Sequence, residues 1–258
     1  MGEAKQKQKS HADILAQGPG CIYCAGANLA TTIEHMPPIQ AFEGRQRPRG
    51  LEFPACQQCN NRTGRADLVA SMLARVVPHA DSIAHREDLT KILAAVSNNV
   101  PGLLHEMNLG RGAEKLARER LGIPDDMHPL RADGPILNHH ILTFAAKLGF
   151  ALHYEVTGTL IPLTGGAQVM WFSNVQALNG QIPHELVSLL PFPSTLQQGR
   201  KSAGEQFRYS FAQGERDHLL YFASFSQSFA VAGITAMDRS VWLQAHVDKF
   251  PIFKPGDF

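Results

Sequence analysis

Two Cys-x-x-Cys pairs constrain this chain more than any other feature of its sequence. The pairs are Cys21/Cys24 and Cys56/Cys59, and residues 25–55 separate them. Two thiolates three positions apart on a tight turn can bind one metal ion, and two such pairs complete a tetrahedral four-sulfur site, usually occupied by zinc. Buried or redox-active cysteines are the alternative, but redox Cys-x-x-Cys motifs rarely come in matched pairs. We therefore predict a structural Zn²⁺ site formed by all four cysteines.

The residues between and after the cysteine pairs predict a strand, a loop, a second strand and a helix. β-Branched residues 31–33 begin a strand that Pro37 ends. A polar loop follows, and the short apolar segment Leu51–Ala55 leads into the second cysteine pair. From Asp67 onward the apolar residues recur at helical spacing. A metal ion bound by all four cysteines would bring the end of the first strand close to the start of the helix.

Three polar residues lie at these two points. Glu34-His35 ends the first predicted strand and is followed by Met36-Pro37, while Asn60 comes directly after Cys59. Together with the cysteine pairs, these residues resemble the HNH, or ββα-metal, endonuclease superfamily, in the branch that builds its motif on a zinc-bound treble clef. The resemblance covers residues 21–75 of the 258-residue chain.

The resemblance implies an activity and the residues that perform it. His35 corresponds to the general base that takes a proton from the attacking water, which suits an imidazole with an ordinary pKa of about 6.5. Glu34, in place of the usual Asp, and Asn60 correspond to the two protein ligands of one Mg²⁺ or Mn²⁺ ion, which prefers oxygen ligands. Leu51 stands where many relatives have an Asn. The implied reaction is hydrolysis of phosphodiester bonds in nucleic acid, with DNA as the favoured substrate, leaving 5′-phosphate and 3′-hydroxyl ends.

A second interpretation of the same motif involves no catalysis. The N-terminal unit would then be a catalytically silent zinc-finger module that binds nucleic acid or protein. Salt-sensitive binding without cleavage would distinguish this alternative from a nuclease.

Positive charge is concentrated around the predicted site. The whole chain has 24 Lys and Arg against 23 Asp and Glu, which excludes a uniformly basic nucleic-acid-binding protein. Residues 1–75 nevertheless contain nine Lys and Arg against six Asp and Glu. Lys5, Lys7 and Lys9 belong to the N-terminal tail, where we expect only generic attraction to nucleic acid. The arginines predicted to contact phosphates are Arg45, Arg47, Arg49, Arg62 and Arg65. For the first three of these, a solvated loop is the alternative.

The rest of the chain predicts an α+β protein in three parts. These are a zinc-bound ββα-metal module over residues 1–78, a helical segment over 79–130, and a C-terminal α+β domain with an antiparallel sheet over 131–258, whose role the sequence does not indicate. In the last part we predict a helix at Ile136–Phe150 and strands at Ala151–Val156, Gln168–Phe172, Gln206–Ala212 and His218–Phe222.

Several other side chains with possible chemistry are better explained by packing. His139 and His140 are adjacent on a predicted helix, where neighbouring side chains diverge by about 100° and cannot easily share a metal ion. With His153 they are typical of packed or surface histidines. The aromatic alternation over residues 207–211 could stack nucleic-acid bases, but a sheet core explains it better.

The sequence also predicts where the protein works and how many copies act together. The chain has no apolar run of about 18 residues, and its first 20 residues lack the apolar stretch of a secretory signal. We therefore expect no membrane partner and a cytoplasmic location. Cutting both strands of a duplex with one site per chain would call for a homodimer.

Overall fold

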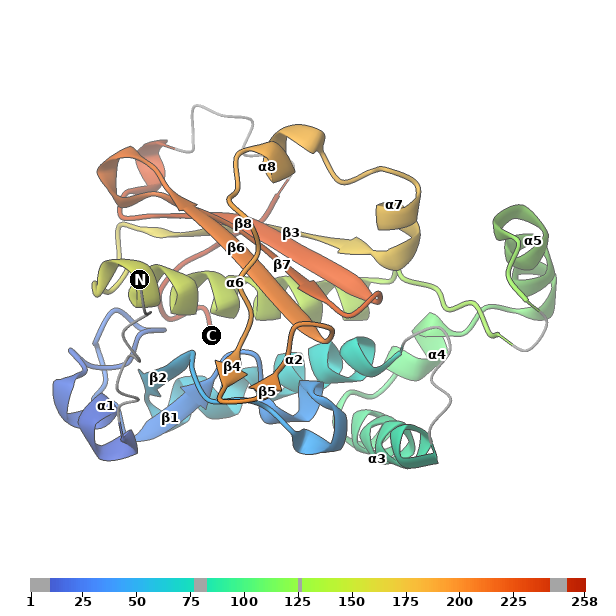
Figure 1. Cartoon of the computed structure of the whole chain (residues 1–258), viewed down its shortest axis with the longest axis horizontal. Helices are drawn as coiled ribbons and strands as arrows, with labels where there is room; N and C mark the ends of the chain where they lie inside the picture. The colour runs from blue at the N-terminus through green and yellow to red at the C-terminus, as the bar shows by residue number, and fades with distance from the viewer. Residues whose placement is uncertain (1–9, 77–82, 125–126, 242–249) are drawn as a thin grey trace.

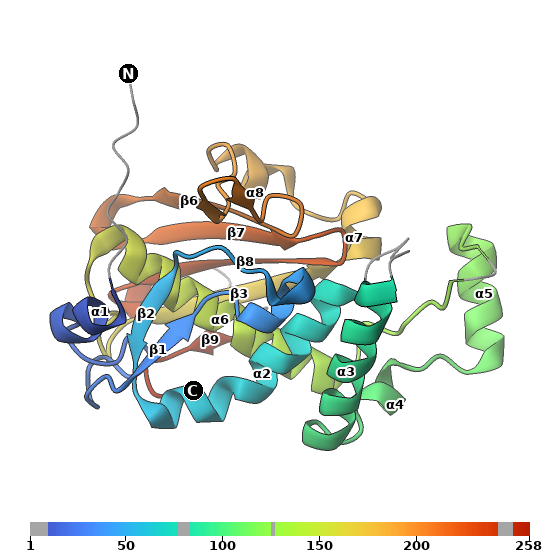
Figure 2. The same ribbon diagram turned by 60° about the horizontal axis from the view of Figure 1, so that its bottom comes forward.

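Figure 1 shows the computed structural model, which describes residues 10–76, 83–124, 127–241 and 250–258. Lys5, Lys7 and Lys9, for which we expected generic attraction to nucleic acid, lie outside these residues. The described elements form a layered arrangement: a β-sheet on one side, helix α6 (Pro135–Thr157) against it, and the N-terminal elements on the opposite side of α6 (Figures 1 and 2).

The N-terminal residues fold as a short helix, a two-stranded hairpin and a long helix. These are α1 (His11–Gln17), β1 (Thr32–His35), β2 (Glu52–Ala55) and α2 (Gln57–Arg75), with 3₁₀ turns η1 (Ile39–Ala41) and η2 (Glu43–Arg45) in the loop between the strands. β1 and β2 are antiparallel, with Thr32 opposite Ala55 and His35 opposite Glu52. The predicted order of strand, loop, strand and helix is therefore present, although α2 begins at Gln57 rather than at the predicted Asp67.

Helices occupy the middle of the chain. They are α3 (Ile83–Asn99), α4 (Leu103–Met107) and α5 (Arg111–Leu121). α2 packs against both α3 and α6, whereas α5 has no buried residue and extends away from the other elements (Figure 1). Gly122 ends α5 with a left-handed φ of 63°, a conformation that glycine adopts without steric cost.

The C-terminal residues form an antiparallel sheet, as predicted. Its order is β6-β7-β8-β3-β9, and the strands are β3 (Gly166–Ser173), β6 (Phe207–Gln213), β7 (Leu219–Phe225), β8 (Phe229–Ala236) and β9 (Ile252–Phe253). Short elements accompany it: α7 (Asn174–Leu178), α8 (His184–Ser188), η3 (Glu215–Asp217), η4 (Arg239–Val241) and the small hairpin of β4 (Gln197–Gln198) and β5 (Lys201–Ser202). In β6, Phe207 is buried and stacks on Tyr209, which supports the sheet-core interpretation of this aromatic alternation.

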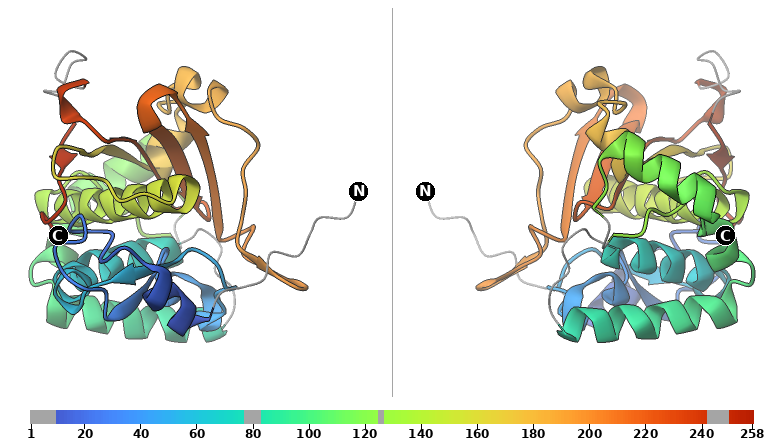
Figure 3. Two further views of the ribbon diagram at one scale, coloured as in Figure 1. Left: turned by 90° about the vertical axis from the view of Figure 1, so that its left-hand side faces the viewer. Right: turned by 90° about the vertical axis from the view of Figure 1, so that its right-hand side faces the viewer.

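Helix α6 is the central element because both the sheet and the N-terminal elements pack on it (Figure 3). The hydroxyl of Tyr221 on β7 donates a hydrogen bond of 2.7 Å to the carbonyl of Ala145. A Cβ atom at Gly149 would come within 2.8 Å of the Tyr221 ring, so glycine allows this close approach between helix and sheet. Every residue of α6 from Phe144 to His153 is buried, which explains why this part of its sequence lacks a simple amphipathic pattern.

Two predictions for the C-terminal part need correction. Ala151–Val156 is not a strand: it is the last part of α6, which continues to Thr157 and ends at Gly158 with a φ of 68°. Its aromatic and β-branched residues indicated a strand, but residues 151–157 contain no glycine or proline that would end the helix. Strand β8 was not predicted, because its sequence is almost wholly apolar and shows no alternation. Seven of its eight residues are buried, as in a strand covered on both faces.

The hydrophobic core is continuous across the boundary expected near residue 130. It runs from Cys21 and Phe53 in the N-terminal elements, through Phe144 and Phe150 of α6, to Phe258. The three-part division of the chain stays a prediction, but the packing joins its first and last parts in one core. None of the helices in the described residues combines the length and apolar character needed to cross a bilayer.

Candidate functional site

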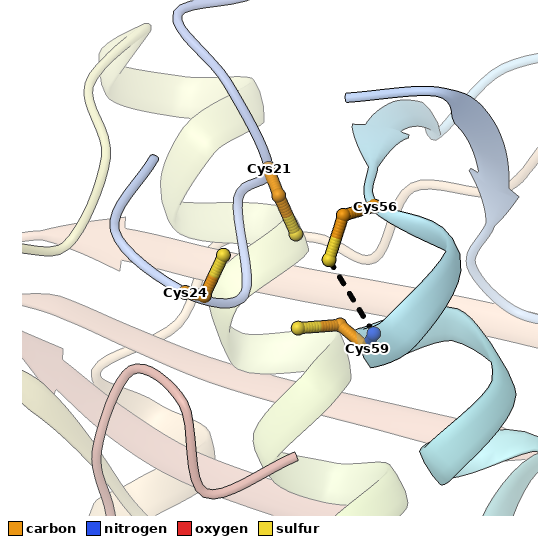
Figure 4. A group of neighbouring side chains, drawn as sticks. All are labelled: Cys21, Cys24, Cys56 and Cys59. Atoms are coloured by element: carbon orange, nitrogen blue, oxygen red, sulfur yellow. Dashed lines mark hydrogen bonds between the residues drawn. The ribbon is translucent and has the colours of Figure 1, made fainter. Parts of the chain in front are cut away.

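The four cysteines come together as predicted (Figure 4). Cys21 and Cys24 lie in the loop before β1, Cys56 caps the N-terminus of α2, and Cys59 is in the first turn of that helix. All four are buried, and their sulfur atoms lie within 4.8 Å of one another. Sulfurs around a tetrahedral zinc with Zn–S bonds of about 2.3 Å would be about 3.8 Å apart, a separation that lies within this limit.

The backbone around Cys21 and Cys24 folds into a tight knuckle. The Cys21 carbonyl accepts a hydrogen bond from Gly26 N at 3.0 Å, and Cys21 N donates to the Asn28 carbonyl at 3.1 Å. Gly20 has a φ of 114°, and a Cβ there would lie 2.8 Å from the Cα of Gly26. The Asn28 amide also lies 3.7 Å from Cys24 Sγ, within reach of a weak N–H···S hydrogen bond. These contacts aim both sulfurs of the first pair at the second pair.

The protonation of the sulfurs is consistent with a cation-binding cluster. A hydrogen bond with Cys59 lowers the pKa of the Cys21 thiol to about 5, and the same contact raises the pKa of Cys59. Burial raises the pKa of Cys24. Without a cation the four sulfurs cannot all be ionised at this spacing, whereas a bound metal ion stabilises four thiolates at once. The cluster can therefore bind a metal such as zinc.

A second group of polar side chains lines a cleft of about 520 Å³ beside the β-hairpin. His35 of β1, Glu52 of β2 and His11 of α1 lie there, and their nitrogen and oxygen ligand atoms are within 4.8 Å of one another. Arg45 and Arg49 from the loop between the strands also line this cleft. His35 and Glu52 share a face of the hairpin because they are opposite each other in the strand register.

The electrostatics of the cleft favour a neutral imidazole beside an ionised carboxylate. Burial, together with the charge of Arg47, lowers the pKa of His35 below its ordinary 6.5. Burial alone would raise the pKa of Glu52, but hydrogen bonding and the charge of Arg49 lower it overall. The Arg49 guanidinium lies 3.1 Å from Glu52 Oε2. At pH 7 His35 can therefore act as a proton acceptor or as a metal ligand.

The structure gives Arg47 a different place from that of Arg45 and Arg49. Its buried guanidinium donates to five backbone carbonyls, those of Met36, Pro37, Pro48, Gly50 and Leu51, at 2.6–3.2 Å. These contacts hold the loop between the two strands in place, and they occupy the hydrogen-bond donors of the Arg47 guanidinium. Arg47 therefore contributes charge to the cleft wall, while the partly exposed Arg49 and the exposed Arg45 are better placed for a phosphate.

Glu34 does not share the cleft with His35. As the neighbouring residue of a strand, it points to the other face and is 4% exposed. Its Oε1 lies 3.2 Å from Nζ of Lys147 on α6, and the same Nζ lies 2.6 Å from Asp67 Oδ2 on α2. Burial raises the pKa of Glu34 to about 7, although the Lys147 charge opposes the increase. A lysine ammonium therefore contacts the carboxylate that we expected to bind a divalent cation.

The other predicted site residues are also separate from the cleft. The side-chain amide of Asn60 donates to Thr32 Oγ1 at 3.3 Å, which ties the start of α2 to β1. Arg62 and Arg65 are exposed on α2, and neither lines the cleft. The structure therefore does not bring Glu34, His35 and Asn60 to one open cavity. The roles assigned to them by resemblance stay predictions.

Three residues that sequence reasoning did not identify have prominent positions. His11 and Glu52 complete the group around His35, and Lys147 forms ion pairs with both Glu34 and Asp67. The strand register could have indicated Glu52. If the two short strands pair as an antiparallel hairpin, Glu52 lies opposite His35. Nothing in the sequence near His11 or Lys147 indicates their contacts, because both arise from the packing of separate helices.

Comparison with known proteins does not assign the chain to a family. A scan against protein-family models found no match, and searches of curated proteins and of solved structures found none either. Functional inference for this chain therefore rests on its own residues and geometry.

Proposed function

We propose that this protein is a metal-dependent nuclease that hydrolyses phosphodiester bonds in nucleic acid, with DNA as the favoured substrate. The observation that carries the proposal is His35, whose lowered pKa keeps it neutral in a cleft that is also lined by Arg45 and Arg49. The order of β1, β2 and α2 around a four-cysteine cluster adds support, because it is the arrangement that the HNH resemblance implies.

The cleft contains the groups that the reaction needs. Arg45 and Arg49 can bind the phosphates on either side of the scissile bond and fix its register without reading sequence. His35 activates water, either as a base or through a bound cation. The water oxygen forms a bond to phosphorus and the bond from phosphorus to the 3′-oxygen breaks. One proton leaves the water, the 3′-oxygen takes up a proton, and the products carry 5′-phosphate and 3′-hydroxyl ends.

In this proposal the two metals have different tasks. Zn²⁺ held by the four cysteines would be structural: Cys21 and Cys24 in the loop before β1 and Cys56 and Cys59 at the start of α2 would bind it, away from the reaction. Mg²⁺ or Mn²⁺ held at the cleft would supply a Lewis acid that stabilises the charge of the transition state. Because Lys147 contacts Glu34 and Thr32 accepts a hydrogen bond from Asn60, we propose polar residues of the cleft, in place of Glu34 and Asn60, as the ligands of the catalytic ion.

A plasmid nicking assay with purified protein and Mg²⁺ or Mn²⁺ tests the proposal. We expect nicking by the unchanged protein, a loss of at least about a hundredfold in His35→Ala, consistent with removing a general acid–base group, and no change in His184→Ala. His184 is a suitable control because it is exposed on α8. Equal nicking by all three proteins would reject the role of His35. A duplex cut on both strands would also call for sedimentation analysis, since two copies would then be expected.

A second candidate function is a nucleic-acid-binding module without catalysis. The contact between Lys147 and Glu34 favours it, because an ammonium group stands where the resemblance implies a divalent cation. Under this alternative, binding would weaken steeply with salt and no DNA or RNA would be cleaved with either metal. The nicking assay and a salt titration on the same preparation distinguish the two functions.

A further inference from the structure

We propose that His11, His35 and Glu52 form a second metal site, specific for a divalent transition-metal ion and separate from the four-cysteine cluster. The three side chains come from α1, β1 and β2, and their ligand atoms lie within 4.8 Å of one another on the wall of the cleft. Metal binding at these residues is an inference of its own, while its use in hydrolysis rests on the proposed function.

The chemistry of the three ligands indicates the kind of ion. Two imidazole nitrogens and one carboxylate oxygen suit Mn²⁺, Fe²⁺, Co²⁺, Ni²⁺ or Zn²⁺, whereas Mg²⁺ prefers oxygen ligands only. Of the two ions proposed for catalysis, Mn²⁺ is therefore the one that fits this site. The cysteine cluster offers sulfur alone, so the two sites differ in the ions and in the spectra that they give. Three protein ligands leave positions open for water and for a phosphate oxygen.

The positions of the three side chains are fixed by the surrounding elements. His35 and Glu52 are directly opposite each other across the hairpin. His11 Nε2 lies 3.6 Å from Glu52 Oε2, and the rings of His11 and His35 meet edge to face at 5.9 Å. Side chains opposite each other on one face of an antiparallel pair stay close, so the ligand pair on the hairpin needs little rearrangement.

Helix α1 is held at the hairpin by local contacts. Ser10 forms a capping box with Asp13: Ser10 Oγ accepts from Asp13 N at 3.2 Å, and Ser10 N donates to Asp13 Oδ2 at 3.0 Å. At the other end of α1, a Cβ on Gly18 would lie 2.8 Å from the side chain of Pro54 on β2. The first residue of this helix, His11, is therefore kept beside the cleft.

Arg49 is the cation that now contacts Glu52. Its Nη2 and Nε lie 3.1 and 3.4 Å from the two carboxylate oxygens. Its side chain is 38% exposed, so it can turn outward when a metal ion binds Glu52. Arg49 would then face the cleft opening, where a substrate phosphate would lie. Metal binding is in this way coupled to the release of Arg49 from Glu52. Arg49→Ala should therefore tighten metal binding, because it removes a competing cation.

Titration of tag-free, zinc-loaded protein with Co²⁺ and with Mn²⁺ tests the site. Visible absorption of Co²⁺ distinguishes nitrogen and oxygen ligands from sulfur, and Mn²⁺ binding is followed by electron paramagnetic resonance. We expect one ion to bind in addition to the zinc, with affinity at least tenfold weaker in His11→Ala and in Glu52→Gln, unchanged in His184→Ala, and tighter in Arg49→Ala. Circular dichroism would confirm that the variants fold, and folding of His11→Ala is expected because His11 is exposed.

The outcomes separate this inference from the proposed function. Co²⁺ binding that is equal in the unchanged protein and in His11→Ala, or absent from both, would overturn the site. Nicking that survives with such a result would leave the nuclease proposal standing. Normal Co²⁺ and Mn²⁺ binding without any nicking would support the site and reject the nuclease.

Discussion

Adjacent residues of one strand have separate environments in this protein. His35 faces the open cleft with His11 and Glu52, whereas Glu34 faces the interior and contacts Lys147. The buried group of Glu34, Asp67 and Lys147 contains two carboxylates and one ammonium, and the ring of Tyr23 lies 5.5 Å from Lys147 Nζ. Although burial lowers the pKa of Lys147, the two carboxylates raise it overall. The positive charge of Lys147 therefore stabilises both carboxylates in the interior.

Replacement of Lys147 should destabilise the protein strongly. Lys147→Met leaves two buried carboxylates without a cation, and we expect the free energy of unfolding to fall by about 3–5 kcal/mol, as when one partner of a buried ion pair is removed. Denaturant unfolding measures the change. Lys91→Met on the exposed face of α3 is the matched control and should be neutral. Adding Glu34→Gln and Asp67→Asn to Lys147→Met should recover part of the loss; no recovery would contradict the electrostatic explanation.

His153 should make the stability of the fold depend on pH. Burial lowers its pKa to about 4, and its Nδ1 lies 2.9 Å from Thr235 Oγ1. Because the folded protein disfavours the protonated ring, the contribution of His153 is complete above about pH 6.5 and is lost as the pH falls toward 4. Relative to His153→Asn, the unchanged protein should lose up to about 3 kcal/mol over this range. Parallel pH dependences of unfolding in the two proteins would disprove this assignment.

The β1–β2–α2 unit shows which parts of a site can be predicted from sequence. The cysteine spacing predicts the metal cluster and the order of the elements, because both follow from local turns and strand signals. The orientation of Glu34 could also have been expected, since alternate strand residues face opposite sides. The partners His11 and Lys147 could not, because they lie on α1 and α6, and helix packing sets their positions. The end of α6 was missed for a related reason: a helix buried on all sides has no periodic pattern to mark its length.

The buried side chain of Arg47 stabilises the conformation of the loop between β1 and β2. Arg47→Ala removes hydrogen bonds to five backbone carbonyls, and we expect the free energy of unfolding to fall by about 3–4 kcal/mol. Arg45→Ala in the same loop is the control. Because Arg45 is exposed, the free energy of unfolding of this variant should not change, whereas its affinity for nucleic acid should decrease. Thermal unfolding and binding at low salt measure the two effects. If Arg45→Ala destabilised the protein as much as Arg47→Ala, the carbonyl contacts would not explain the loop.

At the scale of the whole molecule, the four-cysteine cluster and the C-terminal sheet are parts of one packed core. Tyr23, between Cys21 and Cys24, meets the ring of Phe258 at 5.4 Å, and Phe258 meets Phe150 of α6 at 5.1 Å. The backbone of Gly256 also donates to the Tyr23 carbonyl at 2.8 Å. Since α6 packs on the sheet through Tyr221, a change at the cysteines can reach the sheet through a short series of contacts.

If the four cysteines bind zinc, its loss should therefore unfold the sheet together with the N-terminal elements. Structural zinc sites contribute about 10–16 kcal/mol in small peptides, as much as the whole stability of a typical domain. Chelation of the zinc, or Cys59→Ala, should give one cooperative transition at a lower temperature, and backbone amides of β7 and β8 should lose protection from hydrogen exchange at the same time as those of α2. Ser202→Ala on the exposed hairpin should change neither measurement. A sheet that kept its protection while α2 exchanged freely would show that the two parts unfold independently, and that the contacts through Tyr23 and Phe258 do not couple them.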